Sequence, residues 1–211
     1  MSFYNPSDSK FTPHHHEKVK MLLSAIDCAL HRRGHVIYGS SEITTGLKLY
    51  EELHRRNLKT RDELKVQAGE AWAQIFATNI SVGIEFAEAV RSKLRDNTIV
   101  ITPAPLEVPG WNQDDYLSFW EELLRTRVKS VWFNRNWQFS NGCAFEFAVT
   151  QDAGLPMFDH SGRVLTRSAG VDLITAAIKQ LEEWGLDASG LRKNLALIPA
   201  GLAPIREASA V

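Results

Sequence analysis

The sequence predicts an α/β fold, and three observations lead to this prediction. Short apolar segments such as 98–102 (TIVIT) read as buried strands. They alternate with helical patterns of ten or more residues, which is typical of βαβ units and a parallel sheet covered on both faces. The chain has 211 residues, 44% of them hydrophobic, so it is long enough to bury the core of one domain. We therefore expect a single Rossmann-like domain with a short parallel sheet of four or five strands flanked by helices.

The elements are expected in a fixed order along the chain. Apolar residues at helical spacing between Val19 and Leu30 predict a helical N-terminal extension, and 35–38 (HVIY) predict the first strand. After these we expect helices over 45–57 and 61–95, a strand at 98–102, a helix over 114–127, a strand at 131–133, a helix over 141–153, a strand at 156–158 and a helix over 171–184. A second register would make 74–77 (QIFA) the first strand, with Asn79 in its loop. The helical period through residues 64–94 favours the helix instead.

Three regions of the chain differ in pattern. Residues 1–16 are predicted to form a flexible lead-in, because they contain two prolines and several small polar residues. Residues 17–198 are predicted to form the α/β domain, with a helical insertion at about 57–78. Residues 199–211 are predicted to form a C-terminal tail.

Composition excludes several classes of function. Lys and Arg total 24 against 25 Asp and Glu, and this balance argues against binding to a nucleic acid polymer or to a charged membrane surface. The chain has no apolar run of about 18 residues and no signal-peptide pattern. Cys28 and Cys143 are isolated, and three adjacent histidines in the lead-in do not share one face, so neither group predicts a disulfide framework or a metal site. We expect a cytoplasmic protein that needs no metal or cofactor.

The densest cluster of candidate functional residues follows the strand at 131–133. Ser140 or Asn141 is a natural helix N-cap, and Gly142 lets a ligand approach the first turn closely. The free N–H groups of such a helix start favour a phosphate or a ribose hydroxyl. Glu146 lies six residues beyond Ser140, about 9 Å along a helix, and can reach a sugar held at the helix start. Ser140 can also be only a cap, with Glu146 a favourable charge in the helix.

Other candidates lie at the same predicted edge of the sheet, where ligands of parallel α/β folds bind. Gly39, Ser40 and Ser41 follow the first strand and are candidates for a phosphate or ribose contact. Trp111 and Trp137 lie in loops on this edge and are candidates for stacking on a base. Trp120 and Trp132 fall within apolar elements and are expected in the core.

The run WQFSNGCAFEFAVTQDAGLPM, which contains these residues, resembles the signature of the nucleoside 2-deoxyribosyltransferase-like superfamily. That family has S-x-G-x-x-x-E at the start of a helix, matched here by Ser140, Gly142 and Glu146, and a Gly-x-Pro before the next strand. The resemblance spans roughly residues 35–165 and is specific around 137–156. It implies cleavage or transfer of an N-glycosidic bond in a nucleoside, nucleotide or related ribosyl compound. It also implies that Glu146 is the nucleophile and that the protein is a homodimer or a larger homo-oligomer.

The acid that would protonate the departing base stays open at this point. By order along the chain, Asp114 or Asp115 matches the family's helix acid, so the resemblance implies that Asp115 acts in catalysis and that Asp114 helps to orient the base. Glu122 fits better by its distance from the strand, and Asp159 is a further candidate. Each of them can equally be a solvated surface carboxylate. Cys143 with His160 as a nucleophilic pair is less favoured than a buried thiol.

A second resemblance leads to a different substrate. The spacing of Trp137, Ser140, Cys143 and Glu146 is similar to the catalytic segment of Toll/interleukin-receptor domains, some of which cleave NAD with a glutamate. The remaining alternative is a non-catalytic nucleotide-binding protein of the same fold. It would keep binding at the helix start but would not depend on Glu146.

Overall fold

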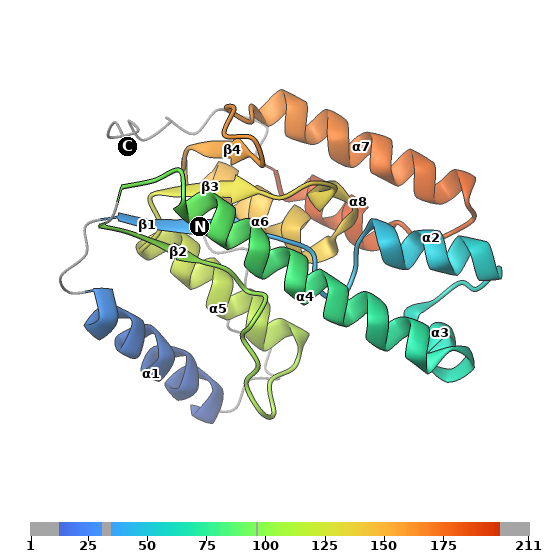
Figure 1. Cartoon of the computed structure of the whole chain (residues 1–211), viewed down its shortest axis with the longest axis horizontal. Coiled ribbons are helices and arrows are strands. Elements are labelled where there is room, and N and C mark those ends of the chain that lie inside the picture. Colours follow the sequence, from blue (N-terminus) through green and yellow to red (C-terminus); the bar gives the residue numbers. More distant parts are fainter. Residues whose placement is uncertain (1–12, 31–34, 96, 199–211) are drawn as a thin grey trace.

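The strands and helices alternate along the chain (Figure 1). The computed structural model describes residues 13–30, 35–95 and 97–198, so the tail predicted at 199–211 and most of the lead-in lie outside the described residues. The elements are α1 (Pro13–Leu30), β1 (His35–Ser40), α2 (Leu47–Arg56), α3 (Arg61–Gln67), α4 (Gly69–Arg91), β2 (Thr98–Ile101), α5 (Gln113–Thr126), β3 (Ser130–Phe133), a 3₁₀ turn η1 (Trp137–Phe139), α6 (Asn141–Asp152), β4 (Met157–Asp159), α7 (Arg167–Glu183) and α8 (Ser189–Ala196).

The four strands form one parallel sheet in the order β2-β1-β3-β4. The predicted α/β class is therefore confirmed, with four strands. The chain leaves β1 toward β2 on one side and later returns to place β3 on the other side of β1. This reversal between β1 and β3 is a topological switch point, and the loops after the two strands diverge there. In register, Ser40 at the end of β1 lies opposite Phe133 at the end of β3.

The two faces of the sheet bury different sets of side chains, because successive residues of a strand point to opposite faces. Ile37 packs with Trp132 and with Phe86 of α4, so α4 covers one face (Figure 1). Tyr38 and Phe133 belong to the larger core on the other face, together with residues of α5, α6, α7 and α8. Both faces of β1 are buried, as expected of a central strand in a parallel sheet.

The helical insertion departs from the prediction in one respect. A single helix was expected over 61–95, but the backbone breaks at Ala68, where φ is −151° and ψ is 57°, and α3 and α4 are separate helices. Thr60 caps α3 by accepting a hydrogen bond from the N–H of Glu63. Residues 74–77 lie within α4, so the alternative in which they form a strand is wrong.

The two ends of the described chain are helical. The N-terminal helix α1 begins at Pro13, four residues inside the region predicted as a lead-in, and it packs on α5. An ion pair with N–O distances of 2.7 Å joins Asp27 of α1 to Arg127, the residue that follows α5. At the other end, α8 was not predicted; it packs against α6 and contributes a contact to the start of that helix.

Gly170 of α7 provides a test of this packing. A Cβ at Gly170 would collide with the buried ring of Phe147 in α6. We expect Gly170→Ala to lower the free energy of unfolding by about 1–2 kcal/mol, because overpacking exceeds the gain in helix propensity. Urea unfolding monitored by circular dichroism measures this change. Gly69→Ala, at the start of α4 with no atom within 4 Å of its Cβ, is the matched control and is expected to cause no loss of stability. Equal effects of the two substitutions would contradict the packing of α7 on α6.

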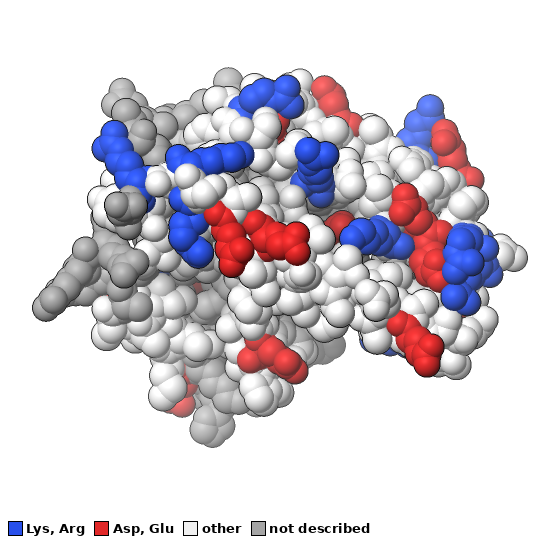
Figure 2. Space-filling model, viewed as in Figure 1, with Lys and Arg blue, Asp and Glu red and all other residues white. Residues whose placement is uncertain are grey.

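The surface carries charges of both signs. Lys, Arg, Asp and Glu side chains all occur on the face shown in Figure 2, in keeping with a formal net charge of −1. No helix in the described part of the chain is long and apolar enough to cross a membrane.

Candidate active site

A buried carboxyl group lies at the centre of the candidate site. Glu146 is in the second turn of α6, and only 5% of its surface is exposed. Its Oε1 accepts a hydrogen bond of 2.6 Å from the hydroxyl of Tyr38, and its Oε2 accepts one of 2.6 Å from the hydroxyl of Ser40. Both donors come from β1, more than 100 residues earlier in the sequence. The sheet therefore brings two distant segments together around one carboxylate.

Local geometry explains why these two hydroxyls converge. Tyr38 and Ser40 are two residues apart in a strand, so their side chains leave the same face of the sheet, toward α6. From β3, the neighbour of β1, the chain passes through η1 into α6, and Ser140 caps the start of that helix. The cluster thus lies at the carboxyl ends of β1 and β3, at the switch point where parallel α/β sheets bind their ligands.

Burial and hydrogen bonding act on Glu146 in opposite directions. Burial disfavours the charged form and raises the pKa of Glu146 to about 7, whereas the hydrogen bonds from Ser40 and Tyr38 favour the carboxylate. The pKa of Tyr38 is raised well above its ordinary value, first by burial and then by the charge of Glu146. Tyr38 therefore stays protonated and acts as a donor. Near neutral pH, Glu146 exists in both the acid and the carboxylate form.

The contribution of Tyr38 is open to a direct test. We expect Tyr38→Phe to raise the pKa of Glu146 further, by about one pH unit, because a hydrogen bond to the charged form is lost. The measurement is a carbon-13 NMR titration of labelled Glu carboxyl groups, with the resonance of Glu146 identified from Glu146→Gln. Tyr116→Phe is the control, since the hydroxyl of Tyr116 accepts from the N–H of Val108 instead. An unchanged or lowered pKa in Tyr38→Phe would contradict the described contact.

The start of α6 is held by side chains of this chain. Ser140 is buried and caps the helix by accepting a hydrogen bond of 3.4 Å from the N–H of Cys143. Thr45, in the segment after β1, accepts a hydrogen bond of 3.0 Å from the N–H of Asn141, and its hydroxyl lies 3.4 Å from that of Ser140. From α8, Asn194 donates to the carbonyl of Asn141. At Gly142 an added Cβ would meet only the hydroxyl of Ser140, at 3.8 Å, so the helix start is open at this position.

Cys143 is buried one turn before Glu146 in α6, and its backbone N–H donates to the hydroxyl of Ser140. Burial raises the pKa of Cys143, and the charge of Glu146 raises it further. Such a thiol is a poor nucleophile. His160 is on the loop after β4, where its carbonyl accepts from Lys93, so no contact of the site supports a pair with Cys143.

The three residues Gly39, Ser40 and Ser41 face different parts of the structure, so they do not form one binding loop. Only Ser40 contacts Glu146. Gly39 faces the other side of the sheet, where an added Cβ would lie 3.6 Å from the ring of Phe86. Ser41 is buried against Gly83 of α4, and its hydroxyl has no hydrogen-bond partner among the described residues. The alternation of side chains along β1 and the turn that follows it separate the three residues.

The three carboxyl groups of α5 that were candidates for protonating the base lie in different surroundings from Glu146. Asp115 is buried and accepts a hydrogen bond of 2.6 Å from the backbone N–H of Asn112, whose side chain accepts in turn from the N–H groups of Asp114 and Asp115. This reciprocal pair is a capping box that fixes the start of α5. The side chains of Asp114 and Glu122 are exposed. None of the three has a described contact with Glu146.

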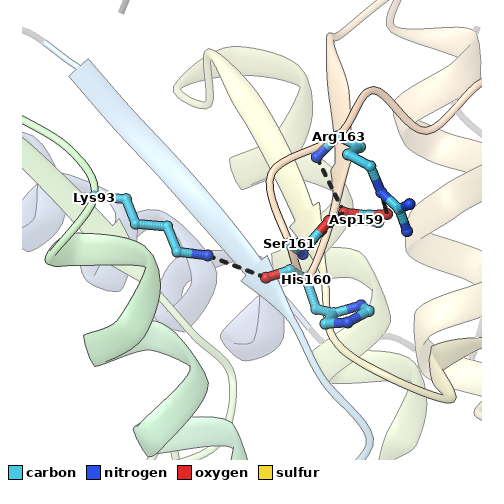
Figure 3. Close-up of polar contacts among 5 residues, drawn as sticks. All are labelled: Lys93, Asp159, His160, Ser161 and Arg163. Atoms are coloured by element: carbon cyan, nitrogen blue, oxygen red, sulfur yellow. Dashed lines mark hydrogen bonds and ion pairs between the residues drawn. The ribbon is translucent and has the colours of Figure 1, made fainter.

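Asp159 is the last residue of β4, and its side chain binds the tight turn that follows the strand (Figure 3). Its Oδ1 accepts from the N–H and hydroxyl of Ser161 and from the N–H of Arg163, and its Oδ2 accepts from the Arg163 guanidinium. Burial alone would raise the pKa of Asp159, but these hydrogen bonds hold it well below its ordinary value. Asp159 is therefore ionised near neutral pH and has no proton to give to a departing base.

The tryptophans proposed for base stacking are packed against other aromatic rings. Trp137 is only 4% exposed, and its ring stacks on that of Phe147 with centroids 4.9 Å apart. It therefore belongs to the core and presents no free face to a base. Trp111 is partly buried and contacts the rings of Tyr116 and Phe119. As predicted, Trp120 and Trp132 are buried core residues.

Two residues of the site were not anticipated: Tyr38 and Thr45. The contact of Tyr38 could have been predicted from its place in a buried strand, because a buried tyrosine hydroxyl needs a hydrogen-bond partner. Thr45 lies in the irregular segment between β1 and α2, where no periodicity indicates which way a side chain points. Within the described ranges, no three His, Cys, Asp or Glu side chains are grouped in a way that would hold a metal ion.

Comparisons with protein-family models, with curated proteins and with solved structures returned no significant match to this chain.

Proposed function

We propose that this protein cleaves an N-glycosidic bond, or transfers its glycosyl group, in a nucleoside, nucleotide or related ribosyl compound. The observation that carries the proposal is the buried carboxyl of Glu146, held by the hydroxyls of Tyr38 and Ser40 at the switch point of the sheet. Burial of a single oriented carboxylate is how enzymes prepare a group that attacks or stabilises a developing cation. The resemblance of residues 137–156 to the nucleoside 2-deoxyribosyltransferase-like superfamily supports the same reaction.

The chemistry follows from the charge that develops during the reaction. Breaking a bond between the anomeric carbon and a base nitrogen leaves positive charge on the sugar, and the bonding electrons leave with the base. The carboxylate of Glu146 stabilises this charge and forms an ester with the anomeric carbon. Water, or the hydroxyl or nitrogen of an acceptor, then displaces Glu146 from the sugar. Hydrolysis and transfer differ only in this second step.

In this proposal each neighbour of Glu146 has a part. Tyr38 and Ser40 orient the carboxylate and favour its ionised form. The open position at Gly142, beside the cap formed by Ser140, admits the sugar or its phosphate at the start of α6. Asn141 fixes that start through its backbone contacts with Thr45 and Asn194. A homodimer or larger homo-oligomer is also part of the proposal, and it rests on the resemblance alone.

The test is a substrate panel followed by chromatography of the free base. The purified protein is incubated with nucleosides, nucleoside monophosphates and NAD. Release of a base from one class of substrate is the expected result and names the substrate. Release of nicotinamide alone would indicate the NAD-cleaving alternative. Binding of nucleotides without release of any base, in a folded protein, would contradict the enzymatic proposal and favour a binding protein.

A further inference from the structure

A second buried carboxyl group lies beside the candidate site and has no role so far. Glu42 is in the segment between β1 and α2, two residues after Ser40, and is only 7% exposed. Its Oε2 accepts a hydrogen bond of 3.2 Å from the N–H of Leu47, the first residue of α2. Gly46 leaves the room that this carboxyl occupies, because an added Cβ there would collide with it. The segment is therefore built around a buried acid.

The segment that holds Glu42 also reaches the start of α6. Thr45, three residues after Glu42, binds the N–H of Asn141. Ser40, two residues before Glu42, donates its hydroxyl hydrogen bond to Glu146. The two buried acids thus share the region at the carboxyl end of β1.

The proposed reaction needs an acid as well as a nucleophile. A purine or pyrimidine is a poor leaving group as an anion, so the nitrogen that leaves the sugar must receive a proton. The carboxyls considered from the sequence meet this need poorly, since Asp159 is ionised in its turn, Asp115 caps α5 and the other two are exposed. Glu42 is buried and near the start of α6.

We propose that Glu42, the buried carboxyl of the segment between β1 and α2, is the acid that protonates the departing base while Glu146 acts on the anomeric carbon. This inference rests on the function proposed above. It assigns the two roles to two carboxyl groups in one site, one ionised and one protonated, which is the usual arrangement in glycoside cleavage.

The surroundings of the two groups favour this distribution of the proton. Glu146 accepts from two hydroxyls, whereas Glu42 accepts from one backbone N–H, so the ionised form is better supported at Glu146. Burial raises the pKa of Glu42 to about 7. The charged and titratable groups that act on Glu42 are Lys48 and Glu51 of α2, which have opposite effects on its pKa, and Cys143 of α6.

Glu146 and Glu42 together account for every bond and every proton in the two steps of the reaction. In the first step, the bond between the anomeric carbon and the base breaks, its electron pair stays on the nitrogen, and the proton of Glu42 moves to the base. A carboxylate oxygen of Glu146 bonds to the anomeric carbon. In the second step, water attacks that carbon and gives a proton to Glu42, while the ester bond breaks and its electrons return to Glu146.

Two substrates distinguish a proton donor at Glu42 from a purely structural residue. One has a leaving group that needs a proton to depart, and the other has a leaving group that does not. The probes are the accepted nucleoside or nucleotide and the 4-nitrophenyl glycoside of the same sugar, since nitrophenolate leaves as an anion. We expect Glu42→Gln to lower kcat/KM for base release by about 10²–10⁴-fold. The same variant is expected to change kcat/KM for nitrophenolate release by less than about threefold, because kcat/KM reports only the first step. The variant should also lose the fall in base release on the alkaline side of the pH profile, because that fall reports deprotonation of Glu42.

Glu42→Asp is the second variant, in case Glu42→Gln fails to fold. It retains a proton donor, so we expect it to keep the alkaline fall at a reduced rate. Equal losses with both leaving groups, or no loss with either, would overturn the assignment of Glu42. If Glu146→Gln still abolishes base release in that case, the proposed function stands without this inference. If the wild type releases base from no member of the substrate panel, the proposed function fails and this inference fails with it.

Discussion

Glu146→Gln is expected to lower kcat/KM for base release by at least about 10³-fold. The amide has nearly the same shape as the carboxyl and can keep hydrogen bonds to Tyr38 and Ser40, so the fold should be preserved. It has no negative charge to stabilise the developing cation, and it is a far weaker nucleophile than a carboxylate. The measurement is base release by chromatography, with circular dichroism to show that the variant is folded.

The matched control for this experiment is Glu88→Gln. Glu88 lies on the exposed side of α4, so the same chemical change there should leave base release within about twofold of the wild type. Equal rates for Glu146→Gln and the wild type would show that the released base has another source, and the assignment of Glu146 would be wrong.

The same substitution is expected to change how stability depends on pH. The pKa of Glu146 is about 7 in the folded protein and 4.5 for an ordinary Glu, so the folded state binds this proton more tightly than the unfolded state. Its contribution to stability is therefore complete below about pH 4.5 and is lost as the pH rises toward 7. Above pH 7 the buried charge disfavours folding by roughly 3 kcal/mol. Glu146→Gln removes this penalty because the amide does not titrate.

Comparing two proteins at two pH values isolates this effect from all other titrating groups, Glu42 included. We measure the free energy of unfolding in urea for the wild type and for Glu146→Gln at about pH 5 and at about pH 8.5. The variant should gain about 2.5 kcal/mol relative to the wild type between the lower and the higher pH. A constant difference, or a relative loss at high pH, would contradict a buried carboxyl with a raised pKa.

The sheet could be predicted from the sequence, because strands buried on both faces have a distinctive pattern. All four predicted strands are present in parallel, and short apolar runs such as TIVIT between helices were sufficient to locate them. The break at Ala68 was not predictable from periodicity, because apolar residues recur at helical spacing on both sides of it. The short helix α8 was also missed, since it carries few apolar residues.

The candidate site was only half visible in the sequence. Ser140 caps α6 and Glu146 lies in its second turn, so the sequence places both at the start of one helix, about 9 Å apart along its axis. The partners of Glu146 come from β1 and depend on which strands are neighbours, which no local pattern encodes. Loop position also misled the prediction for Trp137, because a residue in a short loop can still point into the core.

The central claim is that Glu146 forms a bond to the sugar, and trapping that bond tests it most directly. The wild type is mixed with an excess of the accepted substrate, quenched in acid after a fraction of a turnover, digested and mapped by mass spectrometry. We predict a peptide that carries the mass of the sugar as an ester on Glu146, and no such peptide from Glu146→Gln. Base release by the wild type with the sugar attached to a different residue, or with no attached sugar at any quench time, would contradict the account.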